Sequence, residues 1–461
     1  MSLPLPFRTF FLLNVLSALF FPNPTLQTAL VTPISKDKST NLFTLSVFLK
    51  TPLRPTKLYL DLGFLFPWTV CDANYNSSSF REITCDPAFC ATLGFGGLSC
   101  NNCTDFNPPN PNCVPANLVC GSFPENPVTI RATSDVVLID TLALPTTPGP
   151  GPGPFVLLPN YTFSCAHSTL LKGLPKNVMG LAALGRSNLS FQGQISAALS
   201  SPRCFALCFP ASSKTPGVAF FGSTGPYYVF SSPSSKIDLS KSLIYTPLIL
   251  NPVGVGDTVI TYGGNPPSNQ HFIGLTSIKI NGNNVPINAS LLTINQDDGF
   301  GGTKISTATP YTVLESSIHK AFTELFVKEA SSPAFNLTVT VPAKPFNVCY
   351  PAGDLTVTRV GPLVPTVDLV LHAHDVFWRI SGGNSMVRVR NKRKGVDLWC
   401  LGFVDGGVNK KTPIVIGGKQ LEDNLVQFDL ESNRLGFTSS LLSRSLSCAD
   451  FNVTDFADNG K

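Results

Sequence analysis

Residues 58–72 read LYLDLGFLFPWTVCD, a strand-like apolar run with an acid in its middle, Asp61, followed by Leu62 and Gly63. A carboxylate in such a run costs free energy unless it has a partner. Asp61 therefore raises two questions: which structure needs an acid at this point, and whether the rest of the chain supplies its partner.

The composition is that of a strand-rich globular protein. The chain has 461 residues, 43% hydrophobic and 13% charged, which is enough for a large core and too long for one ordinary domain. Its 40 Pro, 36 Gly and 34 Phe favour many short strands joined by turns over helical bundles. The net charge of +5 is too mild to favour a nucleic-acid partner, but it suits a protein that works near a polyanionic extracellular matrix.

Residues 1–28 have the pattern of a secretory signal peptide. One arginine precedes an apolar run from Phe10 to Phe21, which is too short to span a bilayer and is followed by small polar residues. No later segment has 18 uninterrupted apolar residues. We therefore expect a mature protein that starts near residue 29, is secreted and does not enter a membrane.

Thirteen cysteines fit an exported protein, and seven of them fall between Cys71 and Cys120. The segment CNNC at 100–103 could be half of a zinc site, but none of the five histidines is near it, so disulfides are favoured. An odd number leaves one thiol over. Six sequons are expected to carry glycans, and Asn102 is omitted because a cysteine fills the middle of its sequon: Asn76, Asn160, Asn188, Asn288, Asn336 and Asn452.

A metal site is not expected elsewhere either. His372 and His374 lie two apart on a predicted strand and would face the same side, but no third ligand is evident. The chain also has no Ser-His-Asp triad, phosphate-binding glycine loop or dinucleotide-binding fingerprint. We expect no cofactor and no metal.

The chain has two similar halves. Runs such as LFTLSVFLK (42–50) and NLVQFDL (424–430) predict half-buried strands, and the only helical candidates are 190–199 and 311–330. In each half a strand and turn are followed, after a long gap, by an apolar-apolar-glycine segment, NVMGLAALG and TPIVIGG. We predict an N-terminal lobe at 29–235 with a Cys-rich insertion and a C-terminal lobe at 236–461.

Over nearly the whole mature chain this pattern resembles the pepsin-like aspartic proteinases. In that family each lobe offers an Asp-Thr/Ser-Gly turn, and the two acids meet between the lobes, share a proton and activate one water. The resemblance implies an all-β, bilobal pepsin-like fold with a few short helices. Asp61-Leu62-Gly63 matches the first turn, with Leu where a hydroxyl residue is usual.

The second turn departs from the family. It reads Ser306-Thr307-Ala308-Thr309, with serine in the position of the acid, and the nearby Asp297 and Asp298 are expected at the far end of the preceding strand. Residues 128–142 lack the tyrosine that active members carry in the flap over the cleft. The resemblance therefore implies a scaffold without a catalytic dyad, and no enzyme. Asp61 would serve the geometry of its turn by accepting hydrogen bonds from backbone amides and Ser306.

A narrower resemblance is to a plant subgroup: extracellular dermal glycoproteins, basic 7S globulins, and inhibitors of xylanases and xyloglucan-specific endoglucanases. It rests on ALVTPISKDKSTNLF (29–43), ISTATPYTVLESSIHKAF (305–322), KPFNVCY (344–350) and CADFNVTDF (448–456). It implies a non-proteolytic protein of the apoplast or cell wall. It also implies the pairs Cys71–Cys165, Cys349–Cys400 and Cys208–Cys448, a spare Cys204, and a cluster closed among Cys85, Cys90, Cys100, Cys103, Cys113 and Cys120.

The subgroup's inhibitors block microbial glycoside hydrolases. A glycosidase cleft carries two carboxylates, with which a cation on a rigid loop can pair. Arg444, four residues before Cys448, matches a position that is His in the xylanase inhibitors and Arg in the endoglucanase inhibitors, and Arg359 is the nearest match for a second arginine. The arginine at position 444 favours a xyloglucanase-type target over a xylanase-type one. The alternative is that both are ordinary solvated surface charges.

Two other functions stay open. The basic 7S globulins have the character of storage or peptide-hormone-binding proteins, and an altered aspartic endopeptidase is disfavoured by Ser306. The basic cluster Arg390 to Lys394 is interpreted as a hairpin turn in solvent in preference to a pectin-binding patch.

Overall fold

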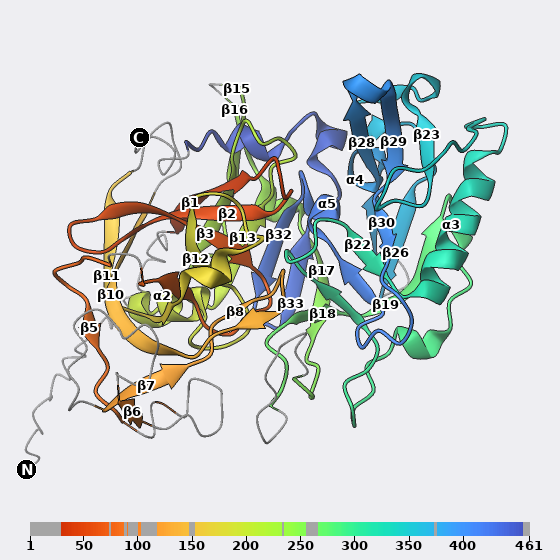
Figure 1. Ribbon diagram of the computed structural model, residues 1–461. Helices are drawn as coiled ribbons and strands as arrows, with labels where there is room; N and C mark the ends of the chain where they lie inside the picture. Colours follow the sequence, from red (N-terminus) through yellow and green to blue (C-terminus); the bar gives the residue numbers. More distant parts are fainter. Residues whose placement is uncertain are drawn as a thin grey trace, which may run out of the picture.

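The computed structural model describes residues 29–72, 75–86, 90, 100–102, 118–146, 153–232, 235–254, 266–372 and 376–454. The predicted signal peptide therefore lies outside the described residues. Strands far outnumber helices, which confirms the expected all-β class, and they form two bodies side by side (Figure 1). No helix among the described residues is long and apolar enough to cross a membrane.

A sheet of six antiparallel strands joins the two halves of the chain. At its seam β13 pairs with β32, from Cys204 opposite Asp429 to Cys208 opposite Leu425. The rings of Phe205 and Phe428 stack across the seam at 4.8 Å. In spatial order the six strands are β1 (Leu30–Lys36), β14 (Gly217–Phe221), β13 (Cys204–Cys208), β32 (Leu425–Asp429), β33 (Arg434–Phe437) and β17 (Ile244–Ile249).

The first half builds its lobe around the strand that ends at Asp61. Strand β12 lies parallel to β3 and antiparallel to β4, and β4 in turn lies parallel to β11. The main strands are β2 (Phe43–Leu49), β3 (Arg54–Asp61), β4 (Trp68–Val70), β10 (Asp135–Pro145), β11 (Phe155–Ala166) and β12 (Val178–Ala183). Shorter ones are β5 (Arg81–Glu82), β6 (Cys100–Asn102), β7 (Leu118–Ser122), β8 (Glu125–Asn126) and β9 (Arg131–Ala132).

The second half repeats this arrangement around the strand that leads to Ser306. Strand β31 lies parallel to β21 and antiparallel to β22, and β22 lies parallel to β30. The strands are β18 (His271–Ile273), β21 (Thr303–Ile305), β22 (Thr312–Leu314), β30 (Phe403–Asp405) and β31 (Ile414–Ile416). The similarity between the halves therefore extends to strand pairing, and it puts residues 61 and 306 in corresponding turns.

Smaller sheets and hairpins complete the molecule. A four-stranded sheet contains β20 (Asn283–Asn284), β19 (Leu275–Ile280), β26 (Val367–Leu371) and β27 (Phe377–Ile380), and a three-stranded one β23 (Cys349–Pro351), β29 (Val396–Leu401) and β28 (Met386–Asn391). The hairpins are β15 (Tyr228–Ser232) with β16 (Ser235–Asp238) and β24 (Val357–Thr358) with β25 (Gly361–Pro362). The predicted lobe boundary at 235/236 falls inside β16 and stays a prediction.

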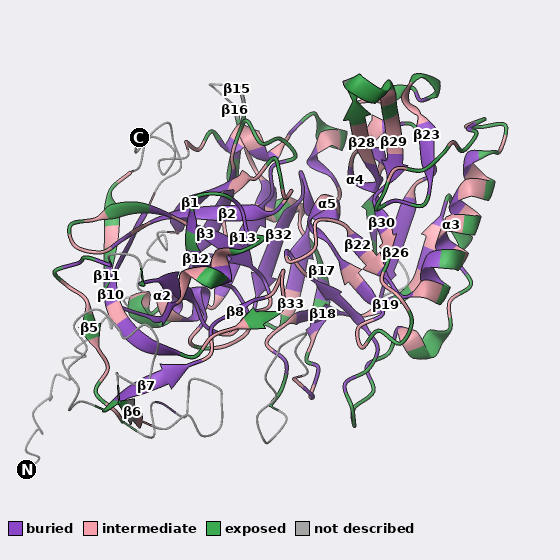
Figure 2. Ribbon diagram, viewed as in Figure 1, coloured by how far each residue is buried: buried purple, intermediate pink, exposed green. Residues whose placement is uncertain are grey.

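Helices are few and short, as expected. In the described part of the chain they are α2 (Phe191–Leu199), α3 (Ser316–Ala330), α4 (Gly382–Ser385) and α5 (Gly418–Leu421), with 3-10 turns η2 (Ser168–Leu171), η3 (Leu239–Ser242), η4 (Ala289–Leu291), η5 (Ala352–Asp354), η6 (Lys392–Lys394), η7 (Leu441–Arg444) and η8 (Cys448–Phe451). Figure 2 shows α3 with buried and exposed faces on the outside of the second body.

The helix predicted at 311–330 begins later than expected. Residues 312–314 form β22 instead, because they pair with both β30 and β31. The Glu315 side chain then accepts hydrogen bonds from the backbone N–H groups of Ser317 and Ile318 and starts α3.

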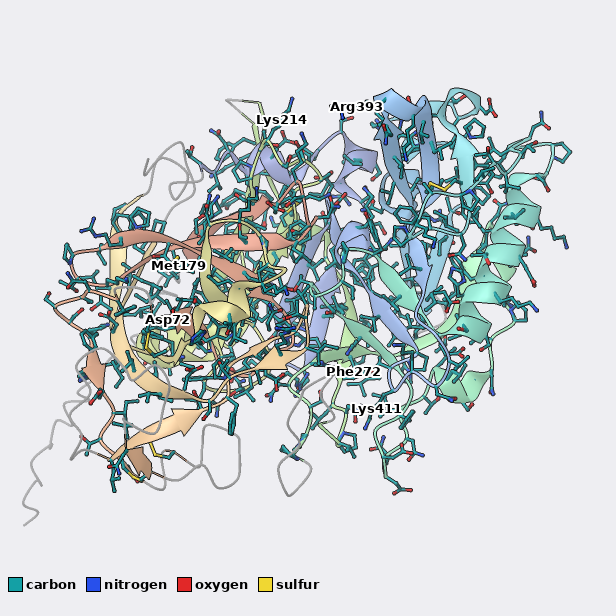
Figure 3. The ribbon with its side chains drawn as sticks, in the orientation of Figure 1. Asp72, Met179, Lys214, Phe272, Arg393 and Lys411 are labelled. Carbon is teal, nitrogen blue, oxygen red and sulfur yellow. A yellow bond between two sulfur atoms is a disulfide. The ribbon has the colours of Figure 1, made fainter. Side chains whose placement is uncertain are left out.

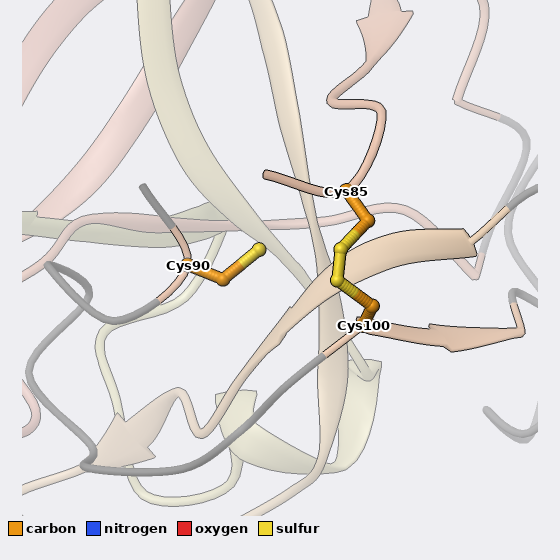
Figure 4. A group of neighbouring side chains, drawn as sticks. All are labelled: Cys85, Cys90 and Cys100. Carbon is orange, nitrogen blue, oxygen red and sulfur yellow. A yellow bond between two sulfur atoms is a disulfide. The ribbon is translucent and has the colours of Figure 1, made fainter. Parts of the chain in front are cut away.

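Five disulfides lie within the described residues. They are Cys71–Cys165, Cys85–Cys100, Cys90–Cys120, Cys208–Cys448 and Cys349–Cys400, whereas Cys103 and Cys113 lie outside the described residues. The sulfur atoms of Cys85, Cys90 and Cys100 lie within 4.8 Å of one another (Figure 4). Because each is in a disulfide, none offers a thiolate to a metal. Of the two histidines considered as ligands, His372 is exposed and His374 lies outside the described residues.

Cys204 is unpaired and fully buried in β13. Burial raises the pKa of its thiol to about 12, so it is protonated and shielded. We expect a thiol reagent to modify the same number of thiols in the native wild type and in the native Cys204→Ala variant. After denaturation, the wild type should have one more reactive thiol than the variant. A difference between the two native proteins would contradict the buried position of Cys204.

All six predicted glycosylation sites are exposed. At Asn160 the side-chain oxygen accepts a hydrogen bond of 2.6 Å from Arg81, which leaves its nitrogen, the atom that a glycan would occupy, free of that contact. Glycosylation at these sites remains a prediction.

Candidate functional site

Asp61 ends β3, and its carboxylate holds the turn that follows. One oxygen accepts hydrogen bonds from the backbone N–H groups of Gly63 (2.9 Å) and Phe64 (2.6 Å). Burial raises the pKa of this carboxyl, while the two amides and the charge of Lys304 act in the opposite direction. The acid therefore serves the geometry of its own turn.

The corresponding turn carries Ser306. Its hydroxyl accepts a hydrogen bond from Ala308 N–H (3.1 Å), and its own N–H donates to the Ile416 carbonyl. The bond expected from Ser306 to Asp61 is not found among the contacts of the described residues. Asp297 and Asp298 are exposed and do not line the cleft described below, so neither supplies the missing acid.

Thr307 links the two turns. Its buried hydroxyl donates to the Leu60 carbonyl (2.7 Å) and accepts from Leu62 N–H (3.2 Å). A reciprocal link from the first turn is not possible, because Leu62 has no hydroxyl. The second turn therefore provides the side-chain bridge between the two halves at this point.

Lys304 is one of the residues of this site that the sequence analysis did not identify. It is 5% exposed, its ammonium donates to the Gln270 side-chain oxygen at 3.1 Å, and its charge favours the ionised form of Asp61. A lysine in the short buried strand before the second turn could have indicated a functional residue, because a buried cation needs a partner. Asp61 thus has a buried cation in its surroundings, two residues before Ser306 in the chain.

The two turns line a cleft of about 330 Å³. The β8–β9 hairpin contributes Val128 and Ile130 to it, and Lys410 and Lys411 line another part. Ile130 is 53% exposed with φ 51°, a strained conformation for a β-branched residue. The cleft retains the shape of a binding site. Two acids line it, Asp61 on the first turn and the buried Glu125 on the β8–β9 hairpin, but the second turn contributes none, and no tyrosine is among the lining residues.

His271 lies at the contact between the halves. It is fully buried, its Nε2 donates to the Leu184 carbonyl at 2.8 Å, and the Phe428 ring lies 4.6 Å away. Burial lowers the pKa of this imidazole to about 3, so it is neutral under ordinary conditions.

Arg444 and Arg359, which are 85 positions apart in the chain, come together on one surface. Arg444 ends η7, is exposed, and donates to the Ser242 hydroxyl at 2.6 Å. Arg359 lies in the turn between β24 and β25 and donates to the hydroxyl of Ser445, the residue after Arg444, at 3.2 Å. Exposed Val357 and Leu363 flank Arg359 on its hairpin.

The Arg390 to Lys394 segment forms the exposed turn of the β28–β29 hairpin, where Arg388 and Arg390 both pair with Asp397. This agrees with the interpretation as a solvated turn. Ion pairs at the surface, such as those of Arg388 and Arg390 with Asp397, contribute little to stability.

Two lobes of one design, with Asp61 and Ser306 in corresponding turns, define a pepsin-like fold. The chain belongs to the xylanase inhibitor family: the "Xylanase inhibitor N-terminal" domain matches residues 43–223 and the "Xylanase inhibitor C-terminal" domain residues 270–439. This family is of the inactive pepsin-like type.

Relatives cover almost the whole chain. The probable aspartic proteinase GIP1 of Glycine max is 55% identical over 99% of both chains. The crystal structure of edgp is 44% identical, covers 93% of this chain and 99% of its own, and superposes with a TM-score of 0.84. Conglutin gamma, a basic 7S globulin from lupine seeds, is 32% identical. The match covers 93% of this chain and 100% of conglutin gamma, with a TM-score of 0.74. These similarities confirm the bilobal fold and the narrower family assignment.

Proposed function

We propose that the protein is a secreted, non-catalytic inhibitor of microbial glycoside hydrolases that degrade the plant cell wall, and that it inserts Arg444 and Arg359 into the enzyme's cleft. The observation that carries the proposal is the contact between Arg359 and Ser445, which brings both cations to one surface. Membership of the xylanase inhibitor family supports binding to this class of enzyme.

The electrostatics of the two arginines support this role. Arg379, Arg388 and Arg434 each pair with a carboxylate. Within the described part of the chain, Arg444 and Arg359 contact only serine hydroxyls and no acid. Their charges therefore remain available for a partner's carboxylates, which in glycosidases lie roughly 5–9.5 Å apart.

The experiment is a titration of the purified protein against fungal xylanases and xyloglucan-specific endoglucanases. We expect inhibition of a xyloglucan-specific endoglucanase, because the position of Arg444 carries Arg and not His. Replacing Arg444 by Ala should weaken inhibition by about 100-fold and replacing Arg359 about tenfold, the range of a main and a lesser interface residue. Arg393→Ala, on the exposed β28–β29 turn, is the matched control and should leave inhibition unchanged.

Inhibition that survives Arg444→Ala would refute the assignment of this surface. Inhibition of no enzyme would favour the second candidate, a peptide-binding or storage globulin, for which the likeness to lupine conglutin gamma is the supporting observation.

The proposal also excludes proteolysis. Ser306 cannot replace the second carboxylate of a dyad, and removing one member of such a cooperating pair abolishes most of the rate. We expect no pepstatin-sensitive cleavage of denatured substrates at acid pH. We also expect Asp61→Asn to inhibit glycosidases as well as the wild type. Acid cleavage that is lost in Asp61→Asn would contradict this.

A further inference from the structure

A second concave site lies on the first half of the chain, apart from the cleft and from the arginine surface. It is a pocket of about 370 Å³ between the end of β1, residues 175–177 and the loop that joins β13 to β14. Its volume falls in the range of small-ligand sites. Five lysines line it, against the single acid Asp37: Lys36, Lys38, Lys57, Lys176 and Lys214.

We propose that this pocket binds an acidic oligosaccharide, a short chain of uronic acids, through several of its carboxylates. The proposal is independent of inhibition, since neither Arg444 nor Arg359 lines the pocket, and the pocket also shares no lining residue with the cleft. In Figure 3, Lys214 lies at the upper edge of the molecule and Lys411, which lines the cleft, at the lower edge.

The positive charge of the pocket is only partly compensated from within. Lys36 forms an ion pair with Glu422, which is 2% exposed and also binds Lys419 at 2.6 Å. One oxygen of Asp37 accepts hydrogen bonds from Ser39 and Thr40 and so supports the turn after β1. Lys38, Lys176 and Lys214 are exposed, and their side chains have no ion pair in the part of the chain that the structure describes.

The kind of cation indicates the kind of anion. All five are lysines, which act as separate point charges, and no arginine lines the pocket to grip one planar carboxylate or phosphate with paired donors. Several point charges spread around a concave surface suit a ligand that carries several separate negative charges.

The neutral residues of the pocket suit a sugar. The exposed residues Asn177, Ser213 and Thr215 offer amide and hydroxyl groups that could bond to sugar hydroxyls, while Pro216 offers an apolar face for the C–H side of a ring. A single inorganic anion would use the lysines but not this remaining surface.

The test is calorimetric titration of the full protein with trigalacturonate, with the same trimer as its methyl ester, and with inorganic phosphate. We expect the free acid to bind at low salt and to weaken as salt screens the charges. The triple variant Lys38→Gln, Lys176→Gln, Lys214→Gln should bind about tenfold more weakly, because exposed charge pairs are individually weak but here act together.

The matched control removes three exposed lysines outside the pocket: Lys241→Gln, Lys320→Gln, Lys328→Gln. It has the same net charge as the pocket variant and should bind like the wild type. If the control variant loses as much affinity as the pocket variant, net charge alone explains the effect, and the pocket is not the binding site. Equal binding of the methyl ester, equal binding of phosphate, or no binding of the trimer would each overturn the assignment of the ligand.

Discussion

Replacing Thr307 by alanine is expected to lower the free energy of unfolding by about 2–4 kcal/mol, because it leaves two buried backbone groups without their partner. The hydroxyl of Thr307 donates to the Leu60 carbonyl and accepts from Leu62 N–H, and both residues are fully buried. Water cannot replace these contacts at a position that is 1% exposed. Denaturant unfolding followed by tryptophan fluorescence measures the loss.

Thr307→Ser is the control for this prediction. It retains the hydroxyl and removes one methyl group, so it should lose only about 1 kcal/mol, the cost of a buried methyl. If serine and alanine are equally destabilising, packing and not the hydrogen-bonded bridge is what Thr307 supplies. Together the two variants test whether the hydroxyl of the second turn holds the two halves together.

The second large effect concerns pH. The folded pKa of His271 is about 3, below the usual 6.5, so the unfolded chain takes up a proton that the folded chain excludes. The contribution of His271 to stability is therefore fully present above pH 6.5 and declines as the pH falls. The expected slope is about 1.4 kcal/mol per pH unit down to the folded pKa, or roughly 3 kcal/mol between pH 6.5 and 4.

His271→Gln isolates this contribution, because glutamine can still donate a hydrogen bond to Leu184 but does not titrate. Burial raises the pKa values of Asp135 and Asp423 to about 6, which favours the folded state at low pH and acts against the histidine. Only the difference between wild type and variant, measured by denaturant unfolding across this pH range, therefore reports on His271. Parallel pH profiles for the two proteins would show that the imidazole is protonated in the folded state.

Thr307 and His271 also explain how the two-lobed fold can be stable without a catalytic dyad. Both act on contacts between the halves, one through the paired turns and one through the Leu184 carbonyl, and neither requires a catalytic dyad. The hydrogen bonds of Arg359 to Ser445 and of Arg444 to Ser242 tie the two arginine loops to their neighbours, and such preorganisation lowers the entropy cost of binding a partner.

Much of the fold and part of the site could be predicted from the sequence, because the signals are local. Alternating apolar residues indicated the strands, and the turns at Asp61-Leu62-Gly63 and Ser306-Thr307-Ala308-Thr309 led to the prediction, by residue type alone, that serine occupies the position of the second acid. The start of α3 could not be placed in this way, since the apolar spacing that predicts a helix was read over all of 311–330, whereas residues 312–314 form β22 by pairing with β30 and β31.

The tertiary structure alone decided which distant residues meet. Lys304 acts on Asp61, Arg359 reaches Ser445, and lysines from positions 36 to 214 surround one pocket. No period or motif in the sequence encodes these encounters, because they depend on how strands far apart in the chain pair and cross. The sequence by itself determined which side chains are available for each role, and long-range strand pairing determined which of them lie together.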